Sequence, residues 1–190
     1  MATLTEIRWH GRGGQGSKTA SILLGKVASK TGKNIQAFPE YGPERMGAPV
    51  LAFNRISENE LTVHCQVNEP SIVVVLDPTL LEVVDVTEGL PEDGTIIVNT
   101  NKSPAEIKEK LDFAGEVFTV DANEISTYEL GAPFPNTPML GALIKATGIL
   151  DFEDFKAQIK KEFEKKFASK PEVIEGNMNC IDKAYQEVRN

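Results

Sequence analysis

Four glycines within six residues, placed between two apolar segments, constrain the fold more than any other feature of the chain. The run Gly11-Arg12-Gly13-Gly14-Gln15-Gly16 follows a predicted short strand over residues 4–10 and precedes a predicted helix over residues 17–31. One apolar face of that helix repeats at spacings of three and four residues, at Ala20, Leu23, Leu24 and Val27. A strand, a glycine loop and a helix therefore open an α/β fold.

Three unbroken apolar runs predict the centre of a sheet. They lie at residues 72–76, 95–98 and 117–120, and strands that are covered on both faces have this composition. A further strand over residues 34–38 leads into an irregular segment, residues 39–49, which holds three prolines and two glycines. We expect a three-layer α/β/α arrangement around a mainly parallel sheet.

An alternating pattern adds an antiparallel element to this expectation. Residues 61–67 alternate apolar and polar side chains, and the short polar segment 57–60 separates them from the apolar residues 50–56. Period-two alternation beside a short connection is typical of a β-hairpin. The sequence therefore predicts a hairpin insertion made of residues 50–56 and 61–67.

Helix start signals follow the predicted strands. Ser103-Pro104-Ala105-Glu106 is a capping box with proline at the first helical position, and Asp121 begins a similar Asp-x-x-Glu arrangement. Another helix starts at Thr137-Pro138, and Asn136 is its expected cap, with a position facing a neighbour as the alternative. Asp77-Pro78, at the end of a buried strand, is interpreted as a turn.

The C-terminal region predicts a pair of amphipathic helices. Two apolar stripes repeat every three or four residues, at Phe152, Phe155, Ile159, Phe163 and Phe167 and again at Met178, Ile181, Tyr185 and Val188. We expect both stripes to pack on the body of the protein, with a partner surface as the alternative, and the lysines of residues 156–166 to form a solvated face. A chain of 190 residues suits one domain, with an α/β core over residues 1–150 and the helical pair over 151–190.

Composition excludes several classes of function. A net charge of −8 disfavours nucleic acid as a partner. The longest apolar runs hold about five residues, far fewer than a membrane span needs, so we expect a soluble, cytoplasmic protein. The two cysteines, Cys65 and Cys180, and the two histidines, His10 and His64, are too few for an iron–sulfur cluster or a multi-histidine metal site in this chain. Metal ligands and catalytic residues are therefore not predicted here, and any cofactor would be held elsewhere.

The glycine loop itself allows several interpretations. Gly11, Gly13 and Gly16 fit the dinucleotide fingerprint in its proper strand–loop–helix context, and Glu40 is the candidate acid for a ribose. A phosphate loop of the NTPase type is disfavoured, because Ser17 separates the last glycine from Lys18. A tight turn that binds nothing is the remaining alternative.

Three separated motifs resemble one known family. They are residues 8–16, residues 38–50 with the unusual Pro-Glu-Tyr-Gly-Pro-Glu-Arg sequence, and residues 74–80 with Asp-Pro-Thr-Leu. In this order they resemble the gamma subunit of 2-oxoacid:ferredoxin oxidoreductases, over about residues 6–150. Gly47-Ala48-Pro49-Val50 and residues 53–56 are most similar to the pyruvate branch, pyruvate synthase. Met46 departs from the second arginine that many relatives carry.

The resemblance implies a subunit that is inactive alone and belongs to a pyruvate:ferredoxin oxidoreductase. Such a complex oxidatively decarboxylates pyruvate with coenzyme A to acetyl-CoA and CO2 and reduces ferredoxin. It implies alpha, beta and delta subunits as partners, and thiamine diphosphate, Mg and 4Fe-4S clusters held mainly by those partners. A free-standing dinucleotide-binding oxidoreductase and a purely structural scaffold are the alternatives.

The resemblance also suggests two loops that face a ligand or a subunit interface on the coenzyme A and thiamine side. The first consists of Gly11, Arg12, Gly13, Gly14, Gln15 and Gly16, as a nest of backbone amides. The second consists of Tyr41, Gly42, Pro43, Glu44 and Arg45, where an arginine fork suits phosphate or carboxylate. His10 and Gln15 are further candidate hydrogen-bond donors near the first loop.

Overall fold

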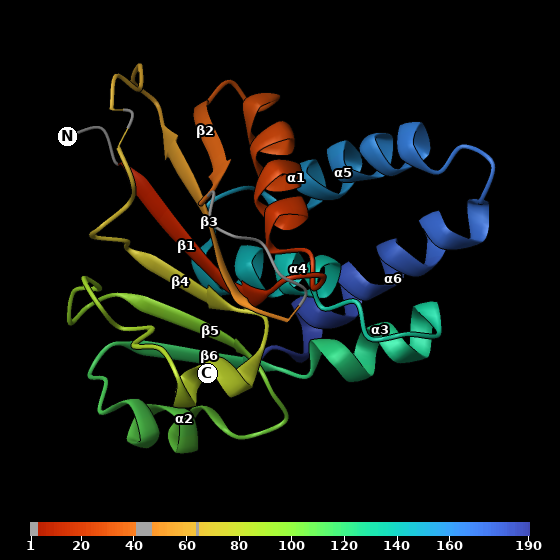
Figure 1. Cartoon of the computed structure of the whole chain (residues 1–190). Coiled ribbons are helices and arrows are strands. Elements are labelled where there is room, and N and C mark those ends of the chain that lie inside the picture. Colours follow the sequence, from red (N-terminus) through yellow and green to blue (C-terminus); the bar gives the residue numbers. More distant parts are fainter. Residues whose placement is uncertain (1–3, 41–46, 64) are drawn as a thin grey trace.

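The structure, a computed structural model, describes residues 4–40, 47–63 and 65–190, and its centre is a six-stranded sheet (Figure 1). The strands are β1 (Thr5–Arg12), β2 (Asn34–Pro39), β3 (Pro49–Ser57), β4 (Ile72–Val75), β5 (Thr95–Asn99) and β6 (Glu116–Val120). They lie in the order β2-β3-β1-β4-β5-β6. β1, β4, β5 and β6 pair in parallel, whereas β3 is antiparallel to both β1 and β2. The predicted mainly parallel sheet is confirmed.

Helices cover both faces of this sheet. They are α1 (Ser17–Ser29), α2 (Pro104–Leu111), α3 (Ala122–Leu130), α4 (Asn136–Thr147), α5 (Phe152–Lys166) and α6 (Pro171–Glu187), with a short 3-10 helix η1 (Pro78–Glu82). Val74 and Ile97 point into one core with α1 and α4, while Val73 and Val75 share a second core with Ile107 of α2. The sheet therefore lies between two helical layers, as the apolar strands predict.

The C-terminal helices pack on the body of the protein. Phe155, Ile159 and Phe163 of α5 are buried in the core that also holds α1, and Ile181 of α6 packs against α4. The contact with α4 is close, because a Cβ added at Gly141 would lie 2.3 Å from the backbone oxygen of Ile181. The docking of both apolar stripes is thus confirmed. Within the described residues, no helix has the length and apolar character to cross a membrane.

One predicted pairing is wrong. Residues 61–67, apart from His64, which lies outside the described residues, form no strand, and the antiparallel partners of β3 are β1 and β2. Both edges of β3 already carry partners, so a third strand has no free ladder to join. Carbonyl groups of this segment instead accept hydrogen bonds from the buried Arg55 of β3, at Cys65 and Gln66 over 2.7 and 3.0 Å. This segment thus covers a charged side chain instead of extending the sheet.

Candidate functional site

The glycine loop lies at the carboxyl edge of the sheet, where open α/β sheets commonly bind ligands. β1 runs two residues further than predicted, because Gly11 and Arg12 still pair with Val50 and Pro49 of β3. The connection to α1 is therefore only residues 13–16, and α1 begins directly at Ser17.

Two glycines explain the composition of this connection. Gly16 has a φ of 86°, in the left-handed region, and a Cβ there would lie 3.0 Å from Cγ of Asn136. At Gly11 a Cβ would lie 2.1 Å from the hydroxyl oxygen of Ser17. Gly16 thus allows the sharp entry into α1, and Gly11 allows the first turn of α1 to approach the end of β1.

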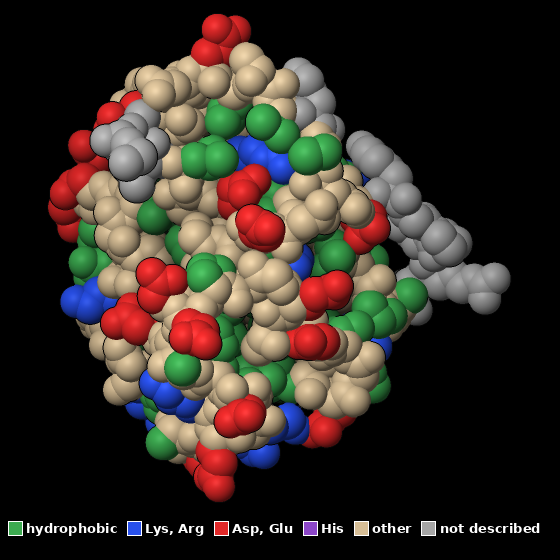
Figure 2. All heavy atoms as spheres, turned by 90° about the vertical axis from the view of Figure 1, so that its left-hand side faces the viewer, with side chains coloured by type: hydrophobic (Ala, Val, Ile, Leu, Met, Phe, Trp, Pro, Cys, Tyr) green, Lys and Arg blue, Asp and Glu red, His purple; other side chains and the backbone are tan. Residues whose placement is uncertain are grey.

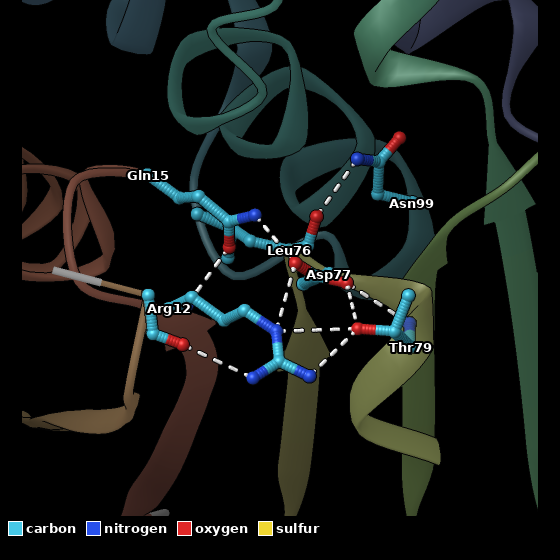
Figure 3. Close-up of polar contacts among 7 residues, drawn as sticks. Arg12, Gln15, Leu76, Asp77, Thr79 and Asn99 are labelled. Carbon is cyan, nitrogen blue, oxygen red and sulfur yellow. Dashed lines mark hydrogen bonds and ion pairs between the residues drawn. The ribbon is translucent and has the colours of Figure 1, made fainter. Parts of the chain in front are cut away.

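Gln15 joins the loop to the neighbouring strand (Figure 3). Its side-chain oxygen accepts a hydrogen bond from the backbone N–H of Arg12 at 2.8 Å, and its Nε2 donates to Asp77 Oδ2 at 2.6 Å. Asp77 follows β4, so these bonds connect the ends of β1 and β4. Gln15 therefore holds the shape of the loop, which differs from the ligand contact considered for it.

Arg12 completes a polar cluster at the same edge (Figure 3). Its Nε lies 3.3 Å from Asp77 Oδ2, its Nη2 donates to Thr79 Oγ1 at 2.8 Å, and its Nη1 donates to the carbonyl oxygen of Gly47 at 3.1 Å. Burial raises the pKa of Asp77, but hydrogen bonds from Thr79 and Gln15 and the charge of Arg12 outweigh it and lower the pKa. An ionised Asp77 therefore anchors the loop.

The amino end of α1 forms the floor of the site. Ser17 is 2% exposed, and among the described residues its hydroxyl has no hydrogen-bond partner. Gly16, the N-cap residue, has no side chain that could cap the first amides of the helix. Unsatisfied amides and the positive end of a helix dipole favour an anion, and the Ser17 hydroxyl adds a donor.

A second helix starts beside the first. Asn136 is the first residue of α4 rather than its cap, so the expected capping is wrong, because the chain enters the helix one residue earlier, from Pro135. The side chain of Asn136 lies against Gly16. The amino ends of α1 and α4 therefore meet at the glycine loop, and both dipoles make this edge electropositive.

A cavity of about 420 Å³ opens over the loop and the first turn of α1. Arg12, Ser17 and Lys18 line one side of it, and Glu40 and Leu51 line the other. This volume falls within the ordinary range for small-molecule sites. The cavity brings together the whole glycine run except Gly11 and Gln15, which are not among its lining residues.

The arrangement of strands weakens the dinucleotide interpretation. In that fold the acid that binds the ribose follows a strand directly beside the first, whereas β3 here separates β2 from β1. Glu40 is therefore about 10 Å, two strand spacings, from the end of β1. Its Oε1 also accepts a hydrogen bond from Gln66 at 2.6 Å.

The second predicted loop, Tyr41, Gly42, Pro43, Glu44 and Arg45, lies outside the described residues, as does Met46. The residues after it contact the glycine loop, since Gly13 N–H donates to Ala48 O at 2.9 Å and Gly47 N–H donates to Gly13 O at 3.2 Å. The chain thus returns to the glycine loop directly after the second predicted loop.

His10 does not serve the loop. Its side chain is 5% exposed, and Nε2 accepts a hydrogen bond from Nε of Arg8 at 3.0 Å. Burial, together with the charge of Arg8, lowers the pKa of His10 to about 3, so the ring is neutral near pH 7. Arg8 in turn donates to the carbonyl oxygens of Val86 and Glu88. Arg8 therefore joins β1 to the connection between β4 and β5.

Comparisons with known proteins agree over nearly the whole chain. The sequence profile of the family described as pyruvate ferredoxin/flavodoxin oxidoreductase matches residues 6–187. Pyruvate synthase subunit PorC of Thermotoga maritima is 48% identical over 184 residues, which cover 97% of this chain and 94% of the relative. The pyruvate/ketoisovalerate oxidoreductases common subunit gamma of Pyrococcus abyssi is 52% identical over 161 residues, 84% of this chain and 87% of that subunit.

Solved structures show the same fold. The crystal structure of pyruvate oxidoreductase subunit PORC from Thermotoga maritima aligns with a TM-score of 0.86 at 45% identity, over 98% of this chain and 97% of that one. A 2-oxoglutarate:ferredoxin oxidoreductase from Magnetococcus marinus aligns with a TM-score of 0.75 at 19% identity, over 96% of this chain but 30% of that chain. At this identity the second likeness concerns the fold alone.

Proposed function

The chain belongs to the pyruvate ferredoxin/flavodoxin oxidoreductase family as a gamma subunit, and on this premise we propose that it works in a pyruvate:ferredoxin oxidoreductase of the cytoplasm. The complex would convert pyruvate and coenzyme A to acetyl-CoA and CO2 and pass two electrons to ferredoxin. Alpha, beta and delta subunits are the proposed partners. Similarity to pyruvate synthase subunits over nearly the full length of both chains carries this proposal.

The chain's own chemistry fits an accessory role. Among the described residues, no three His, Cys, Asp or Glu side chains are grouped as metal ligands. We propose that thiamine diphosphate with Mg, which supplies the decarboxylation chemistry, and the 4Fe-4S clusters are held by the partner subunits, as the resemblance to the family implies. Residues 1–190 are proposed to act as one folded unit beside that centre.

The glycine loop is proposed to hold a phosphate group of coenzyme A. The buried Ser17 hydroxyl, which has no hydrogen-bond partner among the described residues, supports the assignment, since it lies where α1 presents its first amides. Arg12 lines the same cavity and could pair with the ligand without leaving Asp77. The second predicted loop, with Glu44 and Arg45, stays a prediction as a further contributor to this ligand or interface site.

The assembly is tested by co-expressing this chain with the alpha, beta and delta subunits proposed as its partners and purifying the complex without oxygen. We expect the partner subunits, iron and coenzyme A-dependent reduction of ferredoxin to co-elute with this chain, with pyruvate preferred over 2-ketoisovalerate. A lone chain without iron, or one that binds NAD by itself, would contradict the proposal.

The ligand assignment is tested with Ser17→Ala in that complex. Loss of one hydroxyl contact should raise KM for coenzyme A about fivefold while KM for pyruvate stays unchanged. Ser29→Ala, at the exposed far end of the same helix, is the matched control. Unchanged kinetics in a correctly assembled Ser17→Ala complex would show that the loop serves structure only.

A further inference from the structure

A second and larger hollow lies on the helical side of the molecule. This lysine groove has a volume of about 900 Å³ and runs from the glycine loop along α1, between the α3–α4 connection and the junction of α5 with α6. It is lined by residues from five elements that are distant in the sequence. Thr19 and Lys26 of α1 form one wall, and Phe167, Lys170 and Val173 form the other.

The charge of the groove is opposite to that of the chain. The whole chain carries −8, whereas the groove lining holds four lysines, Lys26, Lys165, Lys166 and Lys170, against the single carboxylate of Glu162. Positive charge is therefore concentrated on this surface of an acidic protein. The amino ends of α1 and α4, at the other end of the groove, add to its potential.

Glu162 cannot neutralise this excess. It lies 2.6 Å from Nζ of Lys30, 3.2 Å from Lys165 and 3.8 Å from Lys26. One carboxylate thus serves three ammonium groups. Within the part of the chain that the structure describes, Lys166 and Lys170 form no ion pair. An occupant with negative charge would supply the missing counter-charges.

The floor of the groove is apolar and only partly covered. Leu23, Leu130 and Phe167 are half-buried, and Phe134, on the α3–α4 connection, is 52% exposed. The Phe134 ring lies at the rim of the groove. A small ligand inside the groove would leave this ring exposed. A polypeptide that lies along the groove covers both the floor and the rim.

The charge of the lysine groove disfavours a dimer of this chain joined through the groove. A symmetric pair of chains joined through this groove would place the lysines of one copy against those of the other, which costs free energy. Figure 2 shows the side of the molecule opposite to α5 and α6, where acidic side chains are spread across the surface. That surface could meet the groove only in a head-to-tail contact, which the test below detects.

We infer that the lysine groove docks an acidic segment with apolar side chains from a partner subunit of the same oxidoreductase. The inference rests on the proposed function, because it takes the occupant from that complex. Aspartate or glutamate side chains of the segment pair with Lys166 and Lys170, and its apolar side chains cover Phe134 and Leu130. The contact would hold the partner subunit beside the glycine loop of this chain, since the groove ends at that loop.

The test is Lys166→Glu with Lys170→Glu in the co-expressed complex. Repulsion of an acidic segment should weaken retention of the partner subunit at least about tenfold, and this deficit should shrink as salt is raised. The matched control is Lys160→Glu with Lys161→Glu, which makes the same charge change on α5 outside the groove. The melting temperature of each isolated chain shows whether α5 itself has been damaged.

A second measurement leaves the lysines of the groove unchanged. A photo-crosslinking amino acid placed at Phe134 of the assembled complex should join a segment of a partner subunit rich in Asp and Glu. Crosslinks to a basic or neutral segment, or only to another copy of this chain, would overturn the inference. So would normal assembly of the Lys166→Glu/Lys170→Glu chain with a raised KM for coenzyme A, which would assign the groove to a small anion.

Failure of the two proposals can be distinguished. If the unmodified chain retains no partner subunit at all, the proposed function fails. If the unmodified chain assembles and both double variants assemble equally well, the complex stands and the docking groove is wrong.

Discussion

The glycine loop and the lysine groove are proposed to attract anions by different means. The loop uses backbone amides and a buried hydroxyl, held in place by Arg12, Gln15 and Asp77. The groove uses ammonium groups at the ends of long, exposed side chains such as Lys166 and Lys170. Salt has little effect on the interactions of buried, fixed dipoles, whereas it screens the interactions of exposed charges. Exposed charges also contribute little to the stability of the fold.

This difference predicts which property a substitution in each region should change. A change to Arg12, Gln15 or Asp77 should affect folding, because the internal partners of these side chains would be left unsatisfied. A change in the groove should affect association first. The groove nevertheless depends on α5 and α6 for its walls, and those helices also cover the core.

The largest expected effect comes from removing that wall. A chain that ends at residue 150 should show no cooperative unfolding transition, because Met139 and Leu143 of α4 and Leu24 of α1 share one core with α5 and α6. Far-UV circular dichroism during urea titration measures this. A sharp transition in the shortened chain would show that residues 1–150 fold alone, and the single-domain interpretation would then be wrong.

The loop is tested next by Gly11→Ala. The added Cβ would overlap the Ser17 hydroxyl, so we expect the free energy of unfolding to fall by about 2–3 kcal/mol. The double variant Gly11→Ala/Ser17→Ala removes the overlapping oxygen and leaves a Cβ–Cβ distance of 3.5 Å, an ordinary contact. It should recover most of the loss in urea unfolding. An equal loss in the double variant would mean that the backbone, and not this contact, requires glycine.

Much of the fold follows from the sequence because its signals are local. The capping box at Ser103 and the N-cap at Asp121 are found where the pattern predicts them, since each depends on residues three positions apart. Unbroken apolar runs such as residues 72–76 likewise identify buried parallel strands. The apolar residues of α5 also repeat every three or four positions, which predicts a helix without reference to distant residues.

The errors come from contacts between distant residues. The partner of β3 was mispredicted because alternation in residues 61–67 says nothing of which edges of β3 are free. Asp77 was interpreted as a turn residue, which it is, but its bond to Gln15 spans 62 positions. Ser17 drew attention only as a departure from the phosphate-loop pattern. Its burial without a partner has no local signal, nor does the approach of α4 to Gly16.

The anchor of the loop gives a smaller, pH-dependent effect. Asp77→Asn keeps the shape but removes the charge beside Arg12, and it should lower the free energy of unfolding by about 1–2 kcal/mol at pH 7. The pKa of Asp77 is below its ordinary value of 3.8 in the folded chain, so its stabilisation is present above that pH. It is lost as the pH falls further, through the folded pKa.

The two chains should therefore converge below about pH 4. Urea titrations at a series of pH values measure the difference. Asp85→Asn is the control, since Asp85 also accepts bonds from a threonine two residues on, but that threonine is Thr87 and does not belong to the cluster at the glycine loop. A constant difference down to the lowest pH at which both chains fold would mean that the Asp77 charge does not anchor the loop.

The smallest effect on the isolated chain belongs to the groove. Lys166→Glu with Lys170→Glu should lower the free energy of unfolding by no more than about 1 kcal/mol. The main source of this loss is Lys166, which lies in the last turn of α5, where a cation interacts favourably with the helix dipole. The same measurement on Lys166→Gln with Lys170→Gln should give about half that change. A much larger loss would place these lysines in the internal scaffold of the protein, as Asp77 is, and the contrast between a structural loop and an associative groove would disappear.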